Sequence, residues 1–233
     1  MSNDYILIFD SGSGGEYVLD ICRAILPSEK FVFYKDAHNC PYGDKSFNNL
    51  KRIFFDTLRR LSIKYNFKAV VIACNTMSSM FGDRLKHSKM FKKVFLITPQ
   101  VSRKILSQKT LIIATSNTCR YNKKLLSFRK NRNLTILPLP SFARDIDNAR
   151  YSGHYTVLQR DINSFLSPYI SARIKNVVLG CTHYNYILPQ IENALGPVKF
   201  YENSPSIVLK LKKYLEANSL LSTSGEVIIL ESI

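Results

Sequence analysis

The feature that most constrains this chain is a short motif that occurs twice. Residues 70–76 read VVIACNT, and residues 177–183, 107 positions later, read VVLGCTH. A second pair lies at nearly the same offset, because residues 8–11 (IFDS) correspond to residues 113–116 (IATS). Self-similarity at a fixed offset indicates that the chain folds into two similar units.

Each copy of the motif is an apolar, β-branched run followed by a cysteine and polar residues. Comparable runs predict strands at residues 6–9, 31–34, 69–73, 94–97, 111–114, 135–137, 176–179 and 199–201. Apolar residues three and four apart predict helices between them, at residues 15–26, 47–65, 78–86, 120–129, 155–169, 188–195 and 205–217. This alternation predicts an α/β fold of two pseudosymmetric domains with mainly parallel sheets and the active site in the cleft between them. We expect a discontinuous first domain, residues 1–98 plus 206–233, and a second domain, residues 99–205.

Cys74 and Cys181, the cysteines of the repeated motif, each follow a predicted strand and precede a helical stretch. The carboxyl ends of parallel strands are where open α/β sheets bind ligands. A helix N-terminus stabilises a thiolate, so we expect both thiols to exchange protons near neutral pH. The alternative is that both are small buried residues without chemistry. Their repetition, and the polar residues that follow each, favour the chemical interpretation.

The segment after the first strand, residues 10–15 (DSGSGG), is typical of a backbone that approaches an anion closely. It is not a dinucleotide fingerprint, because Tyr17 occupies the place of the third glycine, and it lacks the lysine of a phosphate loop. Asp10 could equally be a turn or cap residue. His183, two residues after Cys181, can tune the proton affinity of that thiol.

Composition limits the class of protein. The five cysteines contain no Cys-x-x-Cys pair, which argues against a disulfide framework and against a zinc site. No apolar run approaches the roughly 18 residues of a membrane span, and the N-terminus does not resemble a signal peptide, so we expect a cytoplasmic protein without membrane contact. Thirty-three Lys and Arg against seventeen Asp and Glu give a net charge of +16, which would attract nucleic acid, anionic membranes or small anionic substrates. We favour solvated helix faces as its origin.

Taken together, these motifs resemble those of glutamate racemase, in the aspartate/glutamate racemase superfamily. The resemblance runs in family order over roughly residues 5–205. It is carried by residues 9–12 with 14–15, 41–43 with 45–46, 73–76, 114–115 with 118, and 180–184. It implies an isomerase that inverts L-glutamate to D-glutamate for peptidoglycan synthesis and cell-wall biogenesis, with two cysteines and with no cofactor or metal.

The resemblance also implies roles for individual residues. Cys74 and Cys181 would be the opposed acid/base thiols, with Asp10 supporting the first and His183 the second. Substrate would be bound by Ser11, Pro41, Tyr42, Gly43, Asn75, Thr76, Thr118 and Thr182. The family usually carries a glutamate after a proline-containing stretch in the second half; here Asp145 is the nearest acidic candidate. Cys40 stands where an apolar residue is common.

Two alternatives stay open at this point. One is a racemase of aspartate or another small amino acid, although the histidine of Cys-Thr-His favours glutamate. The other is a catalytically weak protein of this fold with a nucleic-acid-binding or regulatory role, since some family members bind DNA gyrase. A homodimer is left open as well.

Overall fold

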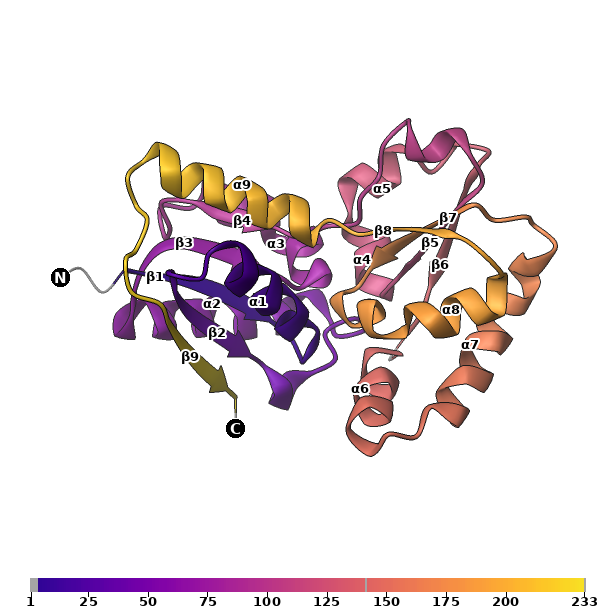
Figure 1. Cartoon of the computed structure of the whole chain (residues 1–233), viewed down its shortest axis with the longest axis horizontal. Coiled ribbons are helices and arrows are strands. Elements are labelled where there is room, and N and C mark those ends of the chain that lie inside the picture. The colour runs from indigo at the N-terminus through magenta and orange to yellow at the C-terminus, as the bar shows by residue number, and fades with distance from the viewer. Residues whose placement is uncertain (1–3, 141, 233) are drawn as a thin grey trace.

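The computed structural model describes residues 4–140 and 142–232, which form two α/β units side by side (Figure 1). Each unit is built on a sheet whose strands all run parallel. The predicted fold class is therefore confirmed. All eight predicted strands are present within a few residues of their expected bounds.

The first sheet has the strand order β4-β3-β1-β2-β9. Its strands are β1 (Asp4–Asp10), β2 (Lys30–Lys35), β3 (Asn66–Ile72), β4 (Val94–Leu96) and β9 (Glu226–Glu231). Strand side chains alternate between the two faces, so both faces bury apolar residues. Leu7 and Val70 pack under helices α2 (Phe47–Lys64) and α3 (Asn75–His87). Ile8 and Val71 pack under α1 (Gly14–Ile25) and α9 (Ser204–Ala217).

The second sheet has the strand order β6-β5-β7-β8. Its strands are β5 (Thr110–Ala114), β6 (Leu134–Pro138), β7 (Asn176–Gly180) and β8 (Lys199–Tyr201). One face packs against α6 (Phe142–Ser152), α7 (Tyr155–Ile170) and α8 (Leu188–Leu195). The short helices α4 (Ser116–Tyr121) and α5 (Lys123–Ser127) follow β5, and Leu125 of α5 packs on the opposite face.

The C-terminal part of the chain returns to the first sheet. Helix α9 buries Val208 and Leu211 among residues of β1, β2 and β3, and β9 pairs with β2 in parallel. This packing supports the domain bounds given above, residues 1–98 plus 206–233 and 99–205, which we keep as a proposal. Strand β9 and helix α6 were not predicted from the sequence.

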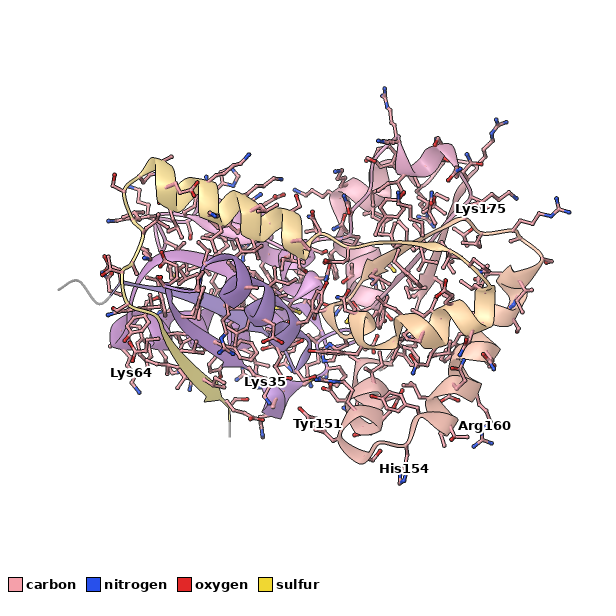
Figure 2. All side chains as sticks on the ribbon, viewed as in Figure 1. Lys35, Lys64, Tyr151, His154, Arg160 and Lys175 are labelled. Atoms are coloured by element: carbon pink, nitrogen blue, oxygen red, sulfur yellow. The ribbon has the colours of Figure 1, made fainter. Side chains whose placement is uncertain are left out.

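Charged side chains cover the outer faces of both units. Lys64, Arg160 and Lys175 are exposed and project from different elements (Figure 2). Within the described residues, no helix is long and apolar enough to cross a membrane. The carboxyl ends of β1 and β3 in one sheet, and of β5 and β7 in the other, carry the residues of the candidate site.

Candidate active site

Cys74 lies between the end of β3 and the first turn of α3, where it is the N-terminal cap residue. Its side chain is buried, and its sulfur lies 3.5 Å from Oγ of Ser11, which follows β1. Burial, and then the negative charge of Asp10, raise the pKa of the Cys74 thiol to about 12. The N-terminus of α3 lies beside Cys74, as predicted from the sequence. Desolvation nevertheless outweighs the lowering of the thiol pKa that a helix N-terminus causes, so Cys74 keeps its proton at neutral pH in this structure.

Cys181 occupies the equivalent position after β7 in the second sheet. It precedes a 3-10 helix, η3 (Thr182–Ile187), and is 8% exposed. Its sulfur lies 3.6 Å from Nδ1 of His183, close enough for a proton to pass between the two side chains. The two copies of the repeated motif therefore place their thiols at the carboxyl ends of equivalent strands, β3 and β7, in the two sheets.

Both cysteines line one small cavity between the two sheets. Ten of the thirteen predicted site residues line it, namely Ser11, Pro41, Tyr42, Gly43, Cys74, Asn75, Thr76, Cys181, Thr182 and His183. Thr115 and Ala143 complete the lining. The cavity has room for about one water molecule, so an amino acid needs the two units to open before it can bind. Larger grooves elsewhere, such as the one between α2 and β9, hold neither thiol.

Asp10, the last residue of β1, is fully buried and does not line this cavity. Its Oδ2 accepts a hydrogen bond of 3.3 Å from the hydroxyl of Thr182, which comes from the other unit. Burial raises the pKa of Asp10 to about 6, although the nearby His183 and two backbone N–H groups oppose the shift. Its Oδ1 has no hydrogen-bond partner among the described residues, and the same holds for Oδ1 of Asn75. Two buried acceptors are thus left for a bound donor.

Three threonine hydroxyls connect the sheets at the other side of the cavity. Oγ1 of Thr76 lies 2.9 Å from Oγ1 of Thr115 and 3.4 Å from Oγ1 of Thr118. Thr115 caps α4 and accepts from the backbone N–H of Thr118. Thr118 is therefore one hydrogen bond away from the cavity, behind Thr115, rather than in its lining.

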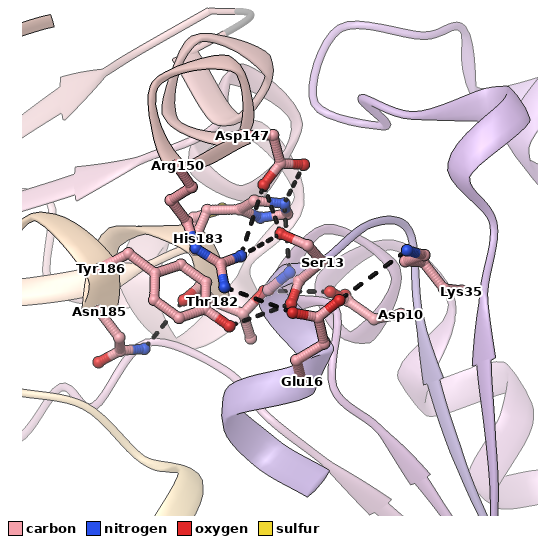
Figure 3. A network of polar contacts seen from close by, with 12 residues as sticks. Asp10, Ser13, Glu16, Lys35, Asp147, Arg150, Thr182, His183, Asn185 and Tyr186 are labelled. Carbon is pink, nitrogen blue, oxygen red and sulfur yellow. Dashed lines mark hydrogen bonds and ion pairs between the residues drawn. The ribbon is translucent and has the colours of Figure 1, made fainter. Parts of the chain in front are cut away.

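His183 is the centre of a polar network that joins the two units (Figure 3). Its Nε2 lies 3.3 Å from Oδ2 of Asp147 and 3.3 Å from the backbone nitrogen of Gly14. A protonated ring donates from Nε2 to Asp147, whereas only a ring unprotonated at Nε2 can accept from Gly14. Burial alone would lower the pKa of His183, but the contacts with Asp147 and Cys181 outweigh it and hold the pKa well above its usual value. The protonated ring facing Asp147 is therefore favoured.

Asp147 is itself held by partners from both units. It accepts a hydrogen bond from Ser13, and Arg150 donates to Oγ of Ser13 at 2.7 Å and to Glu16 at 3.4 Å (Figure 3). Burial would raise the pKa of Asp147, but His183 and these partners lower it below its usual value. The carboxylate thus stays ionised opposite the imidazolium.

The structure does not bring Asp145 to the site. It is exposed and lines a shallow surface pocket with His154 and Asp161. Asp145 and Asp147 both belong to α6, and two positions in a helix differ by about 200° in direction, so the two carboxylates face opposite sides. Of the two carboxylates, Asp147 is the one that contacts His183.

The two units are in close contact at Gly14. A side chain there would collide with Oγ1 of Thr182 and lie 2.8 Å from the backbone nitrogen of His183. Only glycine permits this approach, which brings the loop after β1 against the segment that carries Cys181.

Sequence reasoning missed five residues at the site: Ser13, Thr115, Ala143, Asp147 and Arg150. Ser13 and Thr115 stood in segments quoted above, but nothing in the local pattern distinguished the other three. Among the described residues, one group of metal-type ligands is present, formed by Cys40, Asp147 and His183 at the edge of the cavity.

The chain is similar to known proteins over almost its whole length. No model of a known protein family matches the chain. It is 30% identical to a glutamate racemase from Clostridium perfringens, over 96% of this chain and 88% of that protein. It is 29% identical to one from Clostridium acetobutylicum, over 97% and 90%.

Solved structures give the same result. The glutamate racemase of Francisella tularensis, solved in complex with D-glutamate, has a TM-score of 0.81 and 27% identity, covering 100% of this chain and 89% of that one. A glutamate racemase isoform from Bacillus anthracis has a TM-score of 0.82 at 22% identity, covering 100% and 90%, and shows the shared fold.

Proposed function

The chain belongs to the glutamate racemase family of amino-acid isomerases, and we propose that it inverts glutamate by passing protons between Cys74, Cys181 and the substrate's α-carbon. The observation that carries this proposal is that the two thiols, from matching strand ends of two sheets, line a single cavity. A base on one face of the α-carbon and an acid on the other are what inversion needs. A single group that removed and returned the proton on one side would restore the starting enantiomer.

The proton positions fit one direction of this reaction. Cys74 holds its proton and can donate it. The protonated His183, with Nδ1 3.6 Å from the sulfur, can hold Cys181 as a thiolate, and that thiolate can accept the α-proton on the opposite face. In the reverse direction Cys74 must be the thiolate. The substrate ammonium would then offset the negative charge of Asp10, which is one of the causes that keep Cys74 protonated.

We assign the carboxylate that supports His183 to Asp147 in place of Asp145. Asp147 is a positioning residue, because it contacts the imidazole and not the cavity. Its negative charge stabilises the protonated ring that faces Cys181. Asp10 is assigned to the Cys74 side, as the resemblance implies, and its bond to Thr182 also ties the two units together.

Substrate binding is assigned to the polar groups of the cavity. The unpartnered Oδ1 of Asn75, which lines the cavity, can accept from the ammonium, and the negative charge of Asp10 attracts it. Hydroxyls of Ser11, Thr76 and Thr182, with backbone N–H groups near Gly43, can hold the carboxylates. Removing an α-proton places negative charge on the neighbouring carboxylate, and fixed donors in a cavity without bulk water stabilise that charge. We assign Thr118 an indirect role, through its bond with Thr76.

The experiment is a chiral assay for D-glutamate formed from L-glutamate without an added cofactor. Cys74→Ser and Cys181→Ser should each nearly abolish turnover. The matched control is Cys119→Ser, because Cys119 is a half-buried thiol of α4 that does not line the cavity. If either single variant kept near-wild-type turnover, the two-thiol assignment would be wrong.

Two further assays test the finer assignments. A panel of amino acids, aspartate included, should show inversion of glutamate above the others. Expression of the chain in a bacterium that requires D-glutamate should restore growth, since we assign the product to peptidoglycan synthesis. Growth that still needed added D-glutamate, with soluble and active protein present, would contradict that assignment.

A further inference from the structure

Three side chains of metal-binding type meet at the edge of the catalytic cavity. They are the thiol of Cys40, the carboxylate of Asp147 and the imidazole of His183, and their ligand atoms all lie within 4.8 Å of one another. They come from three separate segments: the loop after β2, helix α6 and the turn after β7. Because no two are close in sequence, no spacing pattern marks them, and the sequence predicted no zinc site.

The donor set is one that zinc accepts. Zn²⁺ binds sulfur at about 2.3 Å, imidazole nitrogen at about 2.0–2.1 Å and carboxylate oxygen at about 2.0–2.2 Å, in a tetrahedral arrangement. At those bond lengths neighbouring ligand atoms lie roughly 3.5 Å apart. The side chains would have to move by only about 1 Å from the separations seen here, which small rotations supply. The fourth tetrahedral position would be open to water.

Two of the three ligands, Cys40 and Asp147, are partly open to solvent, whereas His183 is buried. A pocket of about 480 Å³ opens on Cys40 and Asp147, and Gly12, Lys35 and Tyr151 belong to its walls. Lys35 and Tyr151 come from the two units and lie at the junction between them (Figure 2). A β-carbon on Gly12 would lie 2.9 Å from both Sγ of Cys40 and Nε2 of His183, so glycine at this position keeps a side chain out of the space beside both ligand atoms.

Local charges both favour and oppose a cation. The carboxylate of Asp147 lies 3.3 Å from Nε2 of His183, so both ligand atoms already face the space where a metal would sit. Arg150 opposes a cation, with Nη1 3.9 Å from Oδ1 of Asp147. Binding would release the proton of the Cys40 thiol and the Nε2 proton of His183 to solvent, forming the S–Zn and N–Zn bonds.

We propose that Cys40, Asp147 and His183 form an inhibitory binding site for a thiophilic divalent cation, with Zn²⁺ as the reference ion. A metal bound to Nε2 of His183 replaces the contact between this ring and Asp147 and fixes the charge of the ring. The ring therefore no longer exchanges a proton with Cys181. It also ties Cys40 of the first unit to Asp147 of the second and holds the cavity closed. The inhibitory consequence rests on the proposed function, whereas the binding itself does not.

Titration of the full chain with Co²⁺ tests the binding. A thiolate ligand gives bound cobalt a charge-transfer absorption in the near ultraviolet, and Zn²⁺ should displace it. We expect one such site in the wild-type chain, its loss in Cys40→Ala and Cys40→Ser, and no change in the control Cys119→Ala. Asp147→Asn should weaken binding by about 10–100-fold while keeping the thiolate band.

Turnover measured with Zn²⁺ tests the consequence. Wild-type racemisation should fall with Zn²⁺ and recover with a chelator, and Cys40→Ala should need at least about tenfold more Zn²⁺ for the same inhibition. A thiolate band and zinc sensitivity that persisted in both Cys40 variants would place the metal on Cys74 or Cys181 and overturn the proposal. So would a wild-type chain that bound no Co²⁺. The cobalt titration decides the site even if glutamate is not the substrate, so the two proposals fail separately.

Discussion

Replacing Asp147 by asparagine removes the negative charge that faces Nε2 of His183 at 3.3 Å and leaves the size of the side chain unchanged. His183 is 1% exposed and Asp147 17% exposed at their side chains, so solvent screens this pair little. A hydrogen bond that involves a charged group contributes about 1.5–3 kcal/mol. Because the proposed reaction uses protonated His183 beside Cys181, losing that stabilisation should lower kcat by roughly 10–100-fold. The pKa of His183 should fall, because its contact with Asp147 is the largest cause that raises it.

The assay pairs steady-state racemisation with an NMR titration of the His183 ring. Asp145→Asn is the matched control, since it changes an exposed carboxylate on the opposite face of the same helix. We expect Asp147→Asn to lose turnover with little change in KM and to titrate at lower pH, while Asp145→Asn behaves as wild type. Equal losses in the two variants, or an unmoved His183 titration in Asp147→Asn, would refute the assignment.

Three further predictions concern stability. The pKa of Asp10 is raised to about 6 in the folded chain, against 3.8 for the ordinary group. The native state therefore binds this proton more tightly than the unfolded chain does, and the free energy of unfolding falls as pH rises from about 4 to about 6. Asp10→Asn should remove this pH dependence and raise the free energy of unfolding at pH 7 by about 2–3 kcal/mol in urea titrations. Gly14→Ala should lower the free energy of unfolding by about 1–3 kcal/mol and reduce turnover, because the added β-carbon forces the two units apart. A melting temperature equal to that of the wild type would contradict this prediction. Lys68→Met should lower the free energy of unfolding by about 3–5 kcal/mol in denaturant titrations, because it leaves Glu29 buried without its ion-pair partner at 2.6 Å. The exposed-site control is Lys64→Met. A loss in Lys68→Met smaller than the loss in this control would show that the pair does not stabilise the fold.

Much of the fold could be predicted because its signals are local. Each buried parallel strand is a short β-branched run, and both faces of both sheets are covered, so the runs stand out from the amphipathic helices between them. The repeat of the Cys74 and Cys181 segments then placed both thiols at strand ends. That local pattern, with the resemblance that it carries, located ten of the residues that line the cavity.

The rest depends on contacts between distant segments. Strand β9 pairs with β2 almost 200 positions earlier, and nothing near residue 226 in the sequence indicates that partner. Choosing between Asp145 and Asp147 requires the rotational phase of α6, which follows from burying Phe142 and Ile146 against the second sheet. Cys40 meets His183 only because two units close on each other, and no spacing in the sequence reports that.

The most direct test of the central claim is an early-time exchange measurement in deuterated water. Two thiols on opposite faces remove the proton from one side and return a solvent-derived deuteron from the other. L-glutamate converted in deuterated water should therefore give D-glutamate that carries deuterium at the α-carbon, while the unreacted L-glutamate recovered early stays unlabelled. Equal labelling of substrate and product at low conversion would mean that one group serves both faces, and would contradict the account.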